Sequence, residues 1–443
     1  MGIFRTLIHV GMSVRISTHS SPCTKHDRMV NRLAAYGGLR ASCRNAFQLH
    51  AILLGLMGTL AIAATASEQP SDDSRAAIGS GGAMTLTLGI NRPNLVWAGG
   101  GDLTAQTEVL DALRRSGASR VRLALQLPYE NAVEHVVYCN QLGIDVTIWI
   151  GAADSAFYVE GAVKREGIPN PDAQFPLLWD MYRLAELDIS RFGQVIGGFL
   201  RACHDRGARI EALQIMNEVN WADFNGDLPI VEGGWFVDDT TAWDDERFVV
   251  VREGVRKCGE AIKTARELVD EIYGARQVKI LTPGMADPPD SWVRRVNGSI
   301  VRSALYLELL RGRHARQRDA EDYLKFADGI GVHFYPAVTD TGRDTALQVI
   351  REKMDPILDR AGTDVPYWVT EWGYSRHMFG TPPDESKRLT QFRYFLDALK
   401  SYQPGRIAWG HVMLFNFDMM PQYDVYEDGQ LLESGEILRW LEY

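Results

Sequence analysis

Two glutamates stand at the ends of short apolar runs, where an ionisable side chain is unusual. Glu218 ends the run IEALQIMNE at 210–218, and Glu371 ends the run VPYWVTE at 365–371. Both runs read as buried strands, each with a helix-like segment before it and a polar loop after it. Because a charge is costly inside a core, a carboxylate at such a strand tip needs a specific role. If both tips face one cavity, the two carboxylates can combine acid/base and nucleophilic chemistry.

Alternating strand-like and helix-like segments surround these glutamates from about residue 84 onward. The expected strands are 86–90, 120–125, 145–150, 212–217, 278–282, 329–334, 367–370 and 407–415. The expected helices are 104–116, 130–142, 180–206, 246–273, 303–325, 344–361, 385–402 and 433–442. Eight strands, each followed by a helix, predict a single closed parallel (β/α)8 barrel, the TIM barrel. An open doubly wound sheet is the alternative, but no Gly-rich phosphate loop follows the first strand.

Three strand-to-helix loops are long, and such loops build the active face of a barrel. They span 151–179, 221–245 and 283–302. Their aromatic residues are Trp179, Trp221, Trp235, Trp243, Trp292, Phe157, Tyr158, Phe175, Phe224 and Phe236. Exposed rings among Asp and Asn residues suit sugars, which stack their C–H faces on aromatic side chains. We therefore predict an open carbohydrate cleft and endo action on a polymer, although any single ring could instead pack its loop onto the barrel.

The overall composition is that of a globular protein with an acidic surface. The 443 residues are 46% hydrophobic and 23% charged, and 57 acidic against 47 basic side chains give a net charge of −10. This balance argues against nucleic acid or an anionic membrane as the main partner. A neutral polysaccharide or oligosaccharide remains compatible, and we expect a monomer.

The first 66 residues read as an export leader. Residues 1–49 are basic, 51–64 are apolar, and Ala64-Thr65-Ala66 has the small-residue pattern of a signal-peptidase site. The apolar run is short for a membrane span, although an uncleaved membrane anchor is the alternative. We expect a leader at 1–66, a polar linker at 67–83, a catalytic domain at 84–443, and a periplasmic or extracellular location.

The five cysteines suggest neither disulfides nor zinc. Cys23 and Cys43 lie in the leader, and Cys139, Cys203 and Cys258 lie in helix-like segments without a CxxC spacing. We predict that the last three are buried packing thiols.

Metal and serine chemistry are weakly supported. His333, His377 and His411 show no HxH or HExxH spacing, so we expect no metal and no cofactor. Ser375 lacks the second Gly of a nucleophile elbow.

Three motifs carry a family resemblance: QIMNEVN at 214–220, GVHFYP at 331–336 and VTEWGY at 369–374. They resemble the clan A retaining glycoside hydrolases, with members of families 39 and 5 among the similar groups. The resemblance covers about residues 84–443. It implies a TIM barrel that hydrolyses O-glycosidic bonds by double displacement, with Glu218 as general acid/base and Glu371 as nucleophile.

The same resemblance implies supporting roles for nearby residues. Asn217 is expected to bind the sugar 2-hydroxyl, and Tyr335 to donate a hydrogen bond to Glu371. Arg122 is expected near the nucleophile, with a structural ion pair as the alternative. His333 shares a strand face with Tyr335 and is expected to line the same pocket.

The eighth strand departs from the family pattern. Clan A enzymes usually end this strand with a Trp under the reacting sugar, but Trp409 comes too early here. Phe415 or Phe417 is expected to take that place, and Trp372 to supply part of the sugar platform. We also include Trp221 among the predicted substrate-binding residues.

The prediction is a retaining glycosidase that acts on a glycan such as a bacterial exopolysaccharide or a plant cell-wall polymer. Two alternatives remain open. A barrel could bind sugar without cleaving it, or a transglycosylase could use the same residues to assemble a polysaccharide. Fold and catalytic pair do not determine which sugar is bound.

Overall fold

The computed structural model describes residues 86–165, 180–317, 320–337, 340–402, 407–440 and 443. The predicted leader and linker lie outside these residues, and so do Phe175 and Trp179. Within the described ranges, no helix combines the length and the apolar character needed to cross a membrane.

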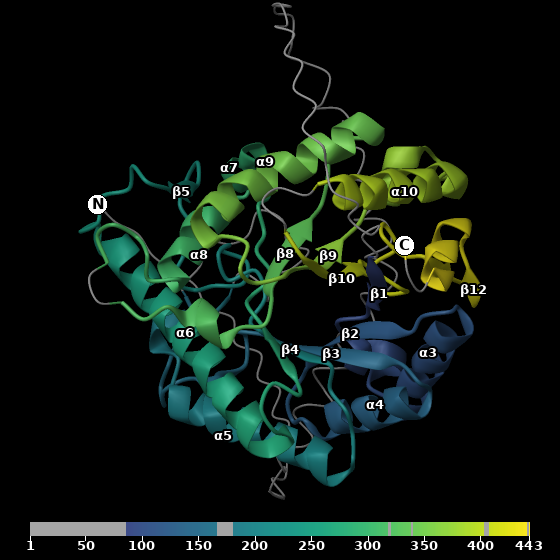
Figure 1. Cartoon of the computed structure of the whole chain (residues 1–443), viewed down its shortest axis with the longest axis horizontal. Coiled ribbons are helices and arrows are strands. Elements are labelled where there is room, and N and C mark those ends of the chain that lie inside the picture. The colour runs from purple at the N-terminus through teal and green to yellow at the C-terminus, as the bar shows by residue number, and fades with distance from the viewer. Residues whose placement is uncertain (1–85, 166–179, 318–319, 338–339, 403–406, 441–442) are drawn as a thin grey trace, which may run out of the picture. The chain divides into compact units, whose positions relative to one another are not determined.

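Eight parallel strands form a closed barrel at the centre of the described residues (Figure 1). They are β1 Thr87–Asn91, β2 Arg120–Leu125, β3 Asp145–Ile150, β4 Ala212–Ile215, β6 Lys279–Leu281, β8 Ile330–Phe334, β9 Tyr367–Trp372 and β10 Trp409–Leu414. Their order is β6-β4-β3-β2-β1-β10-β9-β8. Bridges from Leu281 to Gly329 and from Met285 to Val332 join β6 to β8 and close the ring. The predicted (β/α)8 fold is confirmed.

Helices surround the strands (Figure 1). They are α3 Leu103–Arg115, α4 Glu130–Gln141, α5 Ile189–Asp205, α6 Glu246–Tyr273, α7 Asp290–Arg295, α8 Ser303–Leu310, α9 Arg343–Ala361 and α10 Glu385–Ser401. Four of them, α3, α5, α6 and α10, begin after an aspartate whose carboxylate accepts backbone N–H groups of the first turn: Asp102, Asp188, Asp245 and Asp384. Such caps satisfy N–H groups that have no partner within the helix.

Three predicted helices differ from the structure. The helix predicted at 180–206 begins only at Ile189, because the Asp188 side chain caps it there, and a 3₁₀ turn at Leu184–Glu186 precedes it. The helix predicted at 303–325 ends at Leu310, since Gly312 adopts a left-handed φ of 64° that stops the helix. The last predicted helix is a 3₁₀ segment, Glu433–Arg439.

Two of the long loops are tied to each other outside the barrel. β5 (Trp235–Val237) in the loop 221–245 pairs with β7 (Ser299–Val301) in the loop 283–302. The loop rings Phe224, Trp235, Phe236, Trp243 and Trp292 are partly buried against the core, and Phe157, Tyr158 and Trp221 are buried. These rings pack the loops onto the barrel. This is the alternative that the sequence left open to exposed, sugar-binding rings.

The cysteines behave as predicted. Cys139, Cys203 and Cys258 are buried and free. Burial raises the pKa of each thiol to about 12, so all three are neutral packing groups.

Candidate active site

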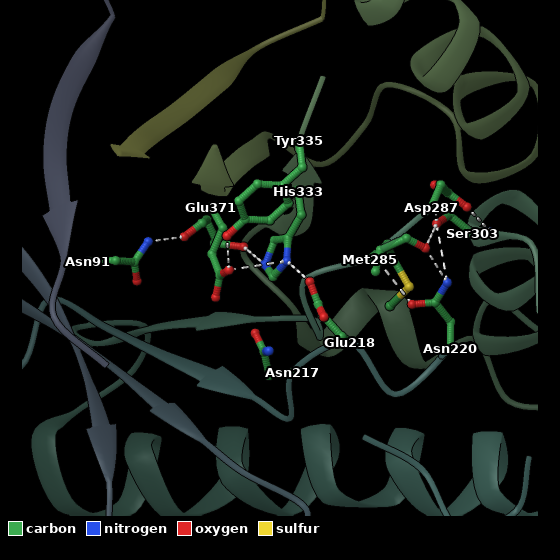
Figure 2. Close-up of polar contacts among 12 residues, drawn as sticks. Asn91, Asn217, Glu218, Asn220, Met285, Asp287, Ser303, His333, Tyr335 and Glu371 are labelled. Atoms are coloured by element: carbon green, nitrogen blue, oxygen red, sulfur yellow. Dashed lines mark hydrogen bonds and ion pairs between the residues drawn. The ribbon is translucent and has the colours of Figure 1, made fainter. Parts of the chain in front are cut away.

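The two glutamates meet at the carboxyl end of the barrel. Glu218 follows β4 and Glu371 lies in β9, which are the fourth and seventh barrel strands, as predicted. One side-chain atom each of Glu218, His333 and Glu371 lies within 4.8 Å of the other two. Figure 2 shows these side chains pointing toward one another. The structure therefore places the predicted carboxylate pair in one site.

Glu371 is enclosed by hydrogen-bond donors. Arg122 Nη1 donates to its Oε1 at 2.7 Å, and the Tyr335 hydroxyl donates to its Oε2 at 2.5 Å. Burial on its own raises the pKa of Glu371, but the charges of His333 and Arg122 and the hydrogen bonds from Tyr335 and Arg122 outweigh it. The resulting pKa is below the ordinary value, so this carboxylate is ionised at neutral pH.

Arg122 is completely buried and holds four strands together. Its Nε donates to Gln214 Oε1 at 2.8 Å and its Nη2 to Asn217 Oδ1 at 2.7 Å. Its Nη1 donates to Asn91 Oδ1 at 2.8 Å as well as to Glu371. Burial lowers the pKa of Arg122, and the adjacent Glu371 opposes this effect. One guanidinium thus fixes the positions of both the predicted nucleophile and the predicted 2-hydroxyl binder.

Asn91 and Gln214 are site residues that sequence reasoning missed. Asn91 ends β1, and its amide also donates to the Thr370 carbonyl oxygen at 2.7 Å. Gln214 lies within β4 and is fully buried. The available signal was a polar residue at an inward-facing position of an otherwise apolar strand.

Glu218 has a different environment from Glu371. Its Oε1 lies 2.6 Å from Nδ1 of His333, and the other ring nitrogen of His333 lies 3.1 Å from Thr370 Oγ1. Among the described residues, this imidazole is the only side chain hydrogen-bonded to the Glu218 carboxyl. A Cβ at Gly284 would lie 2.0 Å from His333 Nε2, so only glycine leaves room for the ring. The contact with His333 allows a proton to be held between the two side chains.

The backbone around Glu218 is held in an uncommon conformation. Met216 and Glu218 have left-handed φ values of 68° and 48°, which cost on the order of 1–3 kcal/mol each for non-glycine residues. The Glu218 N–H donates to the Gly284 carbonyl at 3.0 Å, and its own carbonyl accepts from Trp221 N at 2.8 Å. These bonds fix the direction in which the Glu218 side chain leaves the strand.

Asn220 anchors the loop after Glu218 and was also missed. Its Nδ2 donates to the carbonyls of Ala286 and Val301 at 2.7 and 3.0 Å, and its Oδ1 accepts from Ala286 N at 3.1 Å. Ser303 and Asp287 extend this network beside Asn220, as Figure 2 shows. The loops after the fourth and fifth barrel strands are thereby locked together near Glu218.

A third carboxyl lies near the pair. Burial raises the pKa of Asp223 to about 7, a hydrogen bond from Trp221 opposes the rise, and the charge of Glu218 adds to it. Its Oδ1 is buried without a hydrogen-bond partner among the described residues. Burial thus makes Asp223 a weaker acid than an ordinary aspartate.

Two predicted sugar-binding tryptophans are committed to packing. Trp372 is 1% exposed and stacks on Phe395 of α10 with ring centroids 4.6 Å apart. It follows Glu371 directly, and consecutive strand residues point to opposite faces. Trp221 is 4% exposed, and its ring lies against Gly298. We leave both rings out of the proposed substrate-binding set.

Two other aromatic residues lie beside the catalytic groups. The Phe415 ring centroid is 5.8 Å from that of Tyr335, whereas Phe417 stacks on Tyr426. Trp149 is half-buried in β3, in register with Gln214, and the Arg122 guanidinium lies 5.3 Å from its ring centroid. Phe415 thus lies beside Tyr335, and Trp149, missed from the sequence, adds a ring beside Arg122.

One group of described residues has the donor atoms for a metal ion. Glu218, His333 and Glu371 can each offer a ligand atom. Both Glu371 oxygens already accept from Arg122 and Tyr335, and a cation there would meet the Arg122 charge. The donor set fits proton transfer better than metal binding.

Comparisons with known proteins found no sequence match and several solved structures of low similarity. The sequence matches no protein-family model and no curated protein. Solved structures with a similar fold include a family 39 glycoside hydrolase from Bacteroides cellulosilyticus WH2, with a TM-score of 0.43 and 12% identity over 80% of this chain and 63% of that chain. The chain thus spans less than two thirds of that enzyme.

Other similar structures are also glycoside hydrolases. An exo-β-1,4-mannosidase from Opitutaceae bacterium strain TAV5 has a TM-score of 0.48 and 12% identity, over 80% of this chain and 59% of that chain. A fungal β-1,4-galactanase has a TM-score of 0.44 and 13% identity, over 75% and 90%. At these identities and TM-scores the likeness carries no argument, so the function is argued from the site.

Proposed function

We propose that this protein is a retaining glycoside hydrolase. The observation that carries the proposal is a pair of carboxyl groups with oxygens within 4.8 Å of each other. Retaining glycosidases have carboxyl groups about 5–5.5 Å apart, and inverting enzymes place them about 6.5–9.5 Å apart to admit a water. A spacing this short favours direct attack on the sugar by one carboxylate.

The different surroundings of the two carboxyls assign their roles. Glu371 is kept ionised by Arg122 and Tyr335, which suits a nucleophile. Glu218 faces His333 and carries the proton for the leaving group. In the first step, a Glu371 oxygen forms a bond to the anomeric carbon, the glycosidic C–O bond breaks, and the Glu218 proton goes to the departing oxygen.

The second step releases the sugar. Glu218, now ionised, takes a proton from water as the water oxygen attacks the anomeric carbon, and the bond to Glu371 breaks. Two inversions give net retention. Asn217 supports both steps, because Arg122 occupies its Oδ1 and leaves its amide N–H groups for the sugar 2-hydroxyl. The open side of the site is marked by Tyr335, which is 36% exposed.

The test uses aryl glycosides of glucose, xylose, mannose and galactose. We expect at least one to be cleaved with the anomeric configuration of the first product retained, as followed by proton NMR. A 2-deoxy-2-fluoro glycoside with a good leaving group should label Glu371, identified by peptide mass spectrometry. Inverted product, or a label on Glu218, would contradict the assignment.

Two further outcomes separate the alternatives. Sugar binding without cleavage of any substrate would indicate a non-catalytic carbohydrate-binding barrel. Formation of longer oligosaccharides from an activated donor would indicate a transglycosylase, because an acceptor sugar rather than water then reaches the intermediate.

We also propose that residues 1–66 direct export. Expression of the full chain followed by cell fractionation and N-terminal sequencing tests this proposal. Cleavage after Ala66 is expected, and an intact chain in the membrane fraction would indicate an anchor instead.

A further inference from the structure

One tryptophan differs from all the others in the described residues. Trp97 is 64% exposed, whereas the remaining described tryptophans are buried or half-buried. Leaving an indole ring in water loses the large free energy that its burial would provide, so an exposed Trp often serves as a contact surface. The sequence-based prediction of a carbohydrate cleft considered the three long loops and did not include this residue.

Trp97 lies on the same rim of the barrel as the two carboxylates. It belongs to the 3₁₀ segment Leu95–Gly100, which follows β1 at its carboxyl end. Asn91, the last residue of β1, accepts from Arg122, which in turn donates to Glu371. Six residues span at most about 20 Å, so the Trp97 backbone lies within about that distance of Asn91. A short oligosaccharide covers such a distance.

The segment that carries Trp97 is firmly held. Arg92 N donates to the Arg122 carbonyl at 3.0 Å, and the Arg92 side chain forms a largely buried ion pair with Asp418. Gln106 Nε2 donates to the Val96 carbonyl at 3.1 Å. The neighbouring Leu95 is 2% exposed. The backbone is therefore fixed to the barrel while the adjacent indole ring is left outside, so its exposure is not the fraying of a loose loop.

Hydrogen bonds hold the backbone beside the ring. Trp97 N donates to the Asn94 carbonyl at 3.1 Å, and Gln126 Nε2 donates to Asn94 Oδ1 at 3.4 Å. Gln126 Oε1 is buried and does not face solvent. The exposed ring itself is the feature that suits a sugar, because a flat aromatic ring takes the C–H face of a sugar.

We propose that Trp97 is the platform of a distal sugar subsite. The substrate is then a neutral chain of several sugars that runs from the carboxylates across the end of β1. This inference rests on the proposed glycosidase function and adds the direction and minimum extent of its substrate. The net charge of −10 favours a neutral polymer over an anionic one.

The test compares polymer with monosaccharide substrates in the full chain. The probes are mixed-linkage β-glucan, xylan, mannan and β-1,4-galactan, and the matching aryl monoglycosides. In Trp97→Ala, the ratio of kcat/KM on the best polymer to kcat/KM on its monoglycoside should fall about tenfold. Trp97→Phe, which keeps a ring, should recover most of that ratio. Val249→Ala, which shortens another exposed apolar side chain, on α6, should not change it.

Binding separates this proposal from the proposed function. In affinity electrophoresis, the Glu371→Gln chain should be retarded by the same polymer, and additional replacement of Trp97 by alanine should remove the retardation. Polymer binding that depends on Trp97 without hydrolysis by the wild-type chain would uphold the subsite and overturn the glycosidase. Hydrolysis with an unchanged ratio in Trp97→Ala would overturn the subsite alone. Failure of every polymer to bind or be cleaved would overturn the subsite as well.

Discussion

The two ends of the barrel each contain a histidine paired with a glutamate. At the carboxyl end His333 contacts Glu218, and at the amino end Nε2 of His411 contacts Glu211, which directly precedes β4. Lys279 Nζ lies 3.6 Å from Glu211, so this end also has a basic partner. The two clusters contain similar residue types, yet only the first resembles an active site.

The aromatic side chains beside the two clusters differ. At the amino end Trp368 is 2% exposed, packs its ring 4.3 Å from the His411 ring, and lies beneath the Lys279 ammonium. A Cβ at Gly410 would lie 2.2 Å from this indole, so glycine is needed for the ring to fill the barrel. At the carboxyl end the neighbouring ring, that of Tyr335, is 36% exposed.

Perturbed acidity does not distinguish the two ends. Burial raises the pKa of Glu211, but the hydrogen bond and charge of His411 and the charge of Lys279 outweigh it and leave the pKa lowered. The pKa of Glu371 is lowered in the same way. Structural ion pairs perturb acidity as catalytic groups do. What separates the two sites is the second carboxyl within 4.8 Å at the carboxyl end.

The strongest test of this comparison exchanges one carboxyl at each end for an amide. Glu371→Gln and Glu218→Gln should each lower kcat by about 10²–10⁴-fold or more, because nucleophile or proton donor is lost. Glu211→Gln should keep kcat within about threefold, since Glu211 lies at the amino end of the barrel. The measurement is kcat on an aryl glycoside, with circular dichroism to verify the fold. A comparable loss in Glu211→Gln would abolish the distinction.

A change at the amino end of the barrel should instead have its main effect on the free energy of unfolding. Trp368→Ala removes a buried ring and should lower the free energy of unfolding by about 3–5 kcal/mol. The protein that remains folded should retain its KM, because Trp368 lies at the start of β9, whereas Glu371 lies near its carboxyl end. Urea unfolding and steady-state kinetics at low temperature measure the two effects. An altered KM with unchanged stability would show that the amino end communicates with the site.

The barrel and its pair of carboxylates were predictable because their signals are local. Glu218 and Glu371 each end an apolar run, and strand phase predicts that Trp372, next to Glu371, faces outward. The sequence-based assignment of Trp372 to the sugar platform did not apply that rule. Local patterns also located most strand ends. They did not locate the start of α5, which the side chain of Asp188 sets by capping the helix.

The supporting network was less predictable, because its contacts join distant parts of the chain. Arg122 and Glu371 are 249 positions apart, and the partners Asn91 and Gln214 come from two other strands. A polar residue at an inward position indicates a partner without identifying it. The burial of loop rings such as Trp235 depends on the pairing of β5 with β7, which no periodicity in either loop reveals.

A smaller effect is expected from removing one hydroxyl group at the carboxyl end of the barrel. Tyr335→Phe removes a hydrogen bond to an ionised carboxylate, which is worth about 1.5–3 kcal/mol, so kcat/KM should fall about 10–100-fold. The hydrogen bond lowers the pKa of Glu371, so its loss raises that pKa. The acidic limb of the pH profile should therefore move to higher pH. Tyr374→Phe, which removes another buried tyrosine hydroxyl, is the control.

The smallest predicted effect concerns the pH dependence of the stability that Glu211 contributes at the amino end. Because the pKa of Glu211 is lowered on folding, its contribution to stability is present above the unfolded value of about 4.3 and is lost as pH falls through the folded value. Wild type should exceed Glu211→Gln in free energy of unfolding by about 1–2 kcal/mol at pH 7. His411, Lys279 and Arg120 are the charged groups that act on Glu211. Urea unfolding at pH 7, 5 and 3 should show this difference shrinking toward zero. A difference that grows as the pH falls would mean that Glu211 is protonated in the folded protein, and the amino end would then lack the ion pair on which the comparison depends.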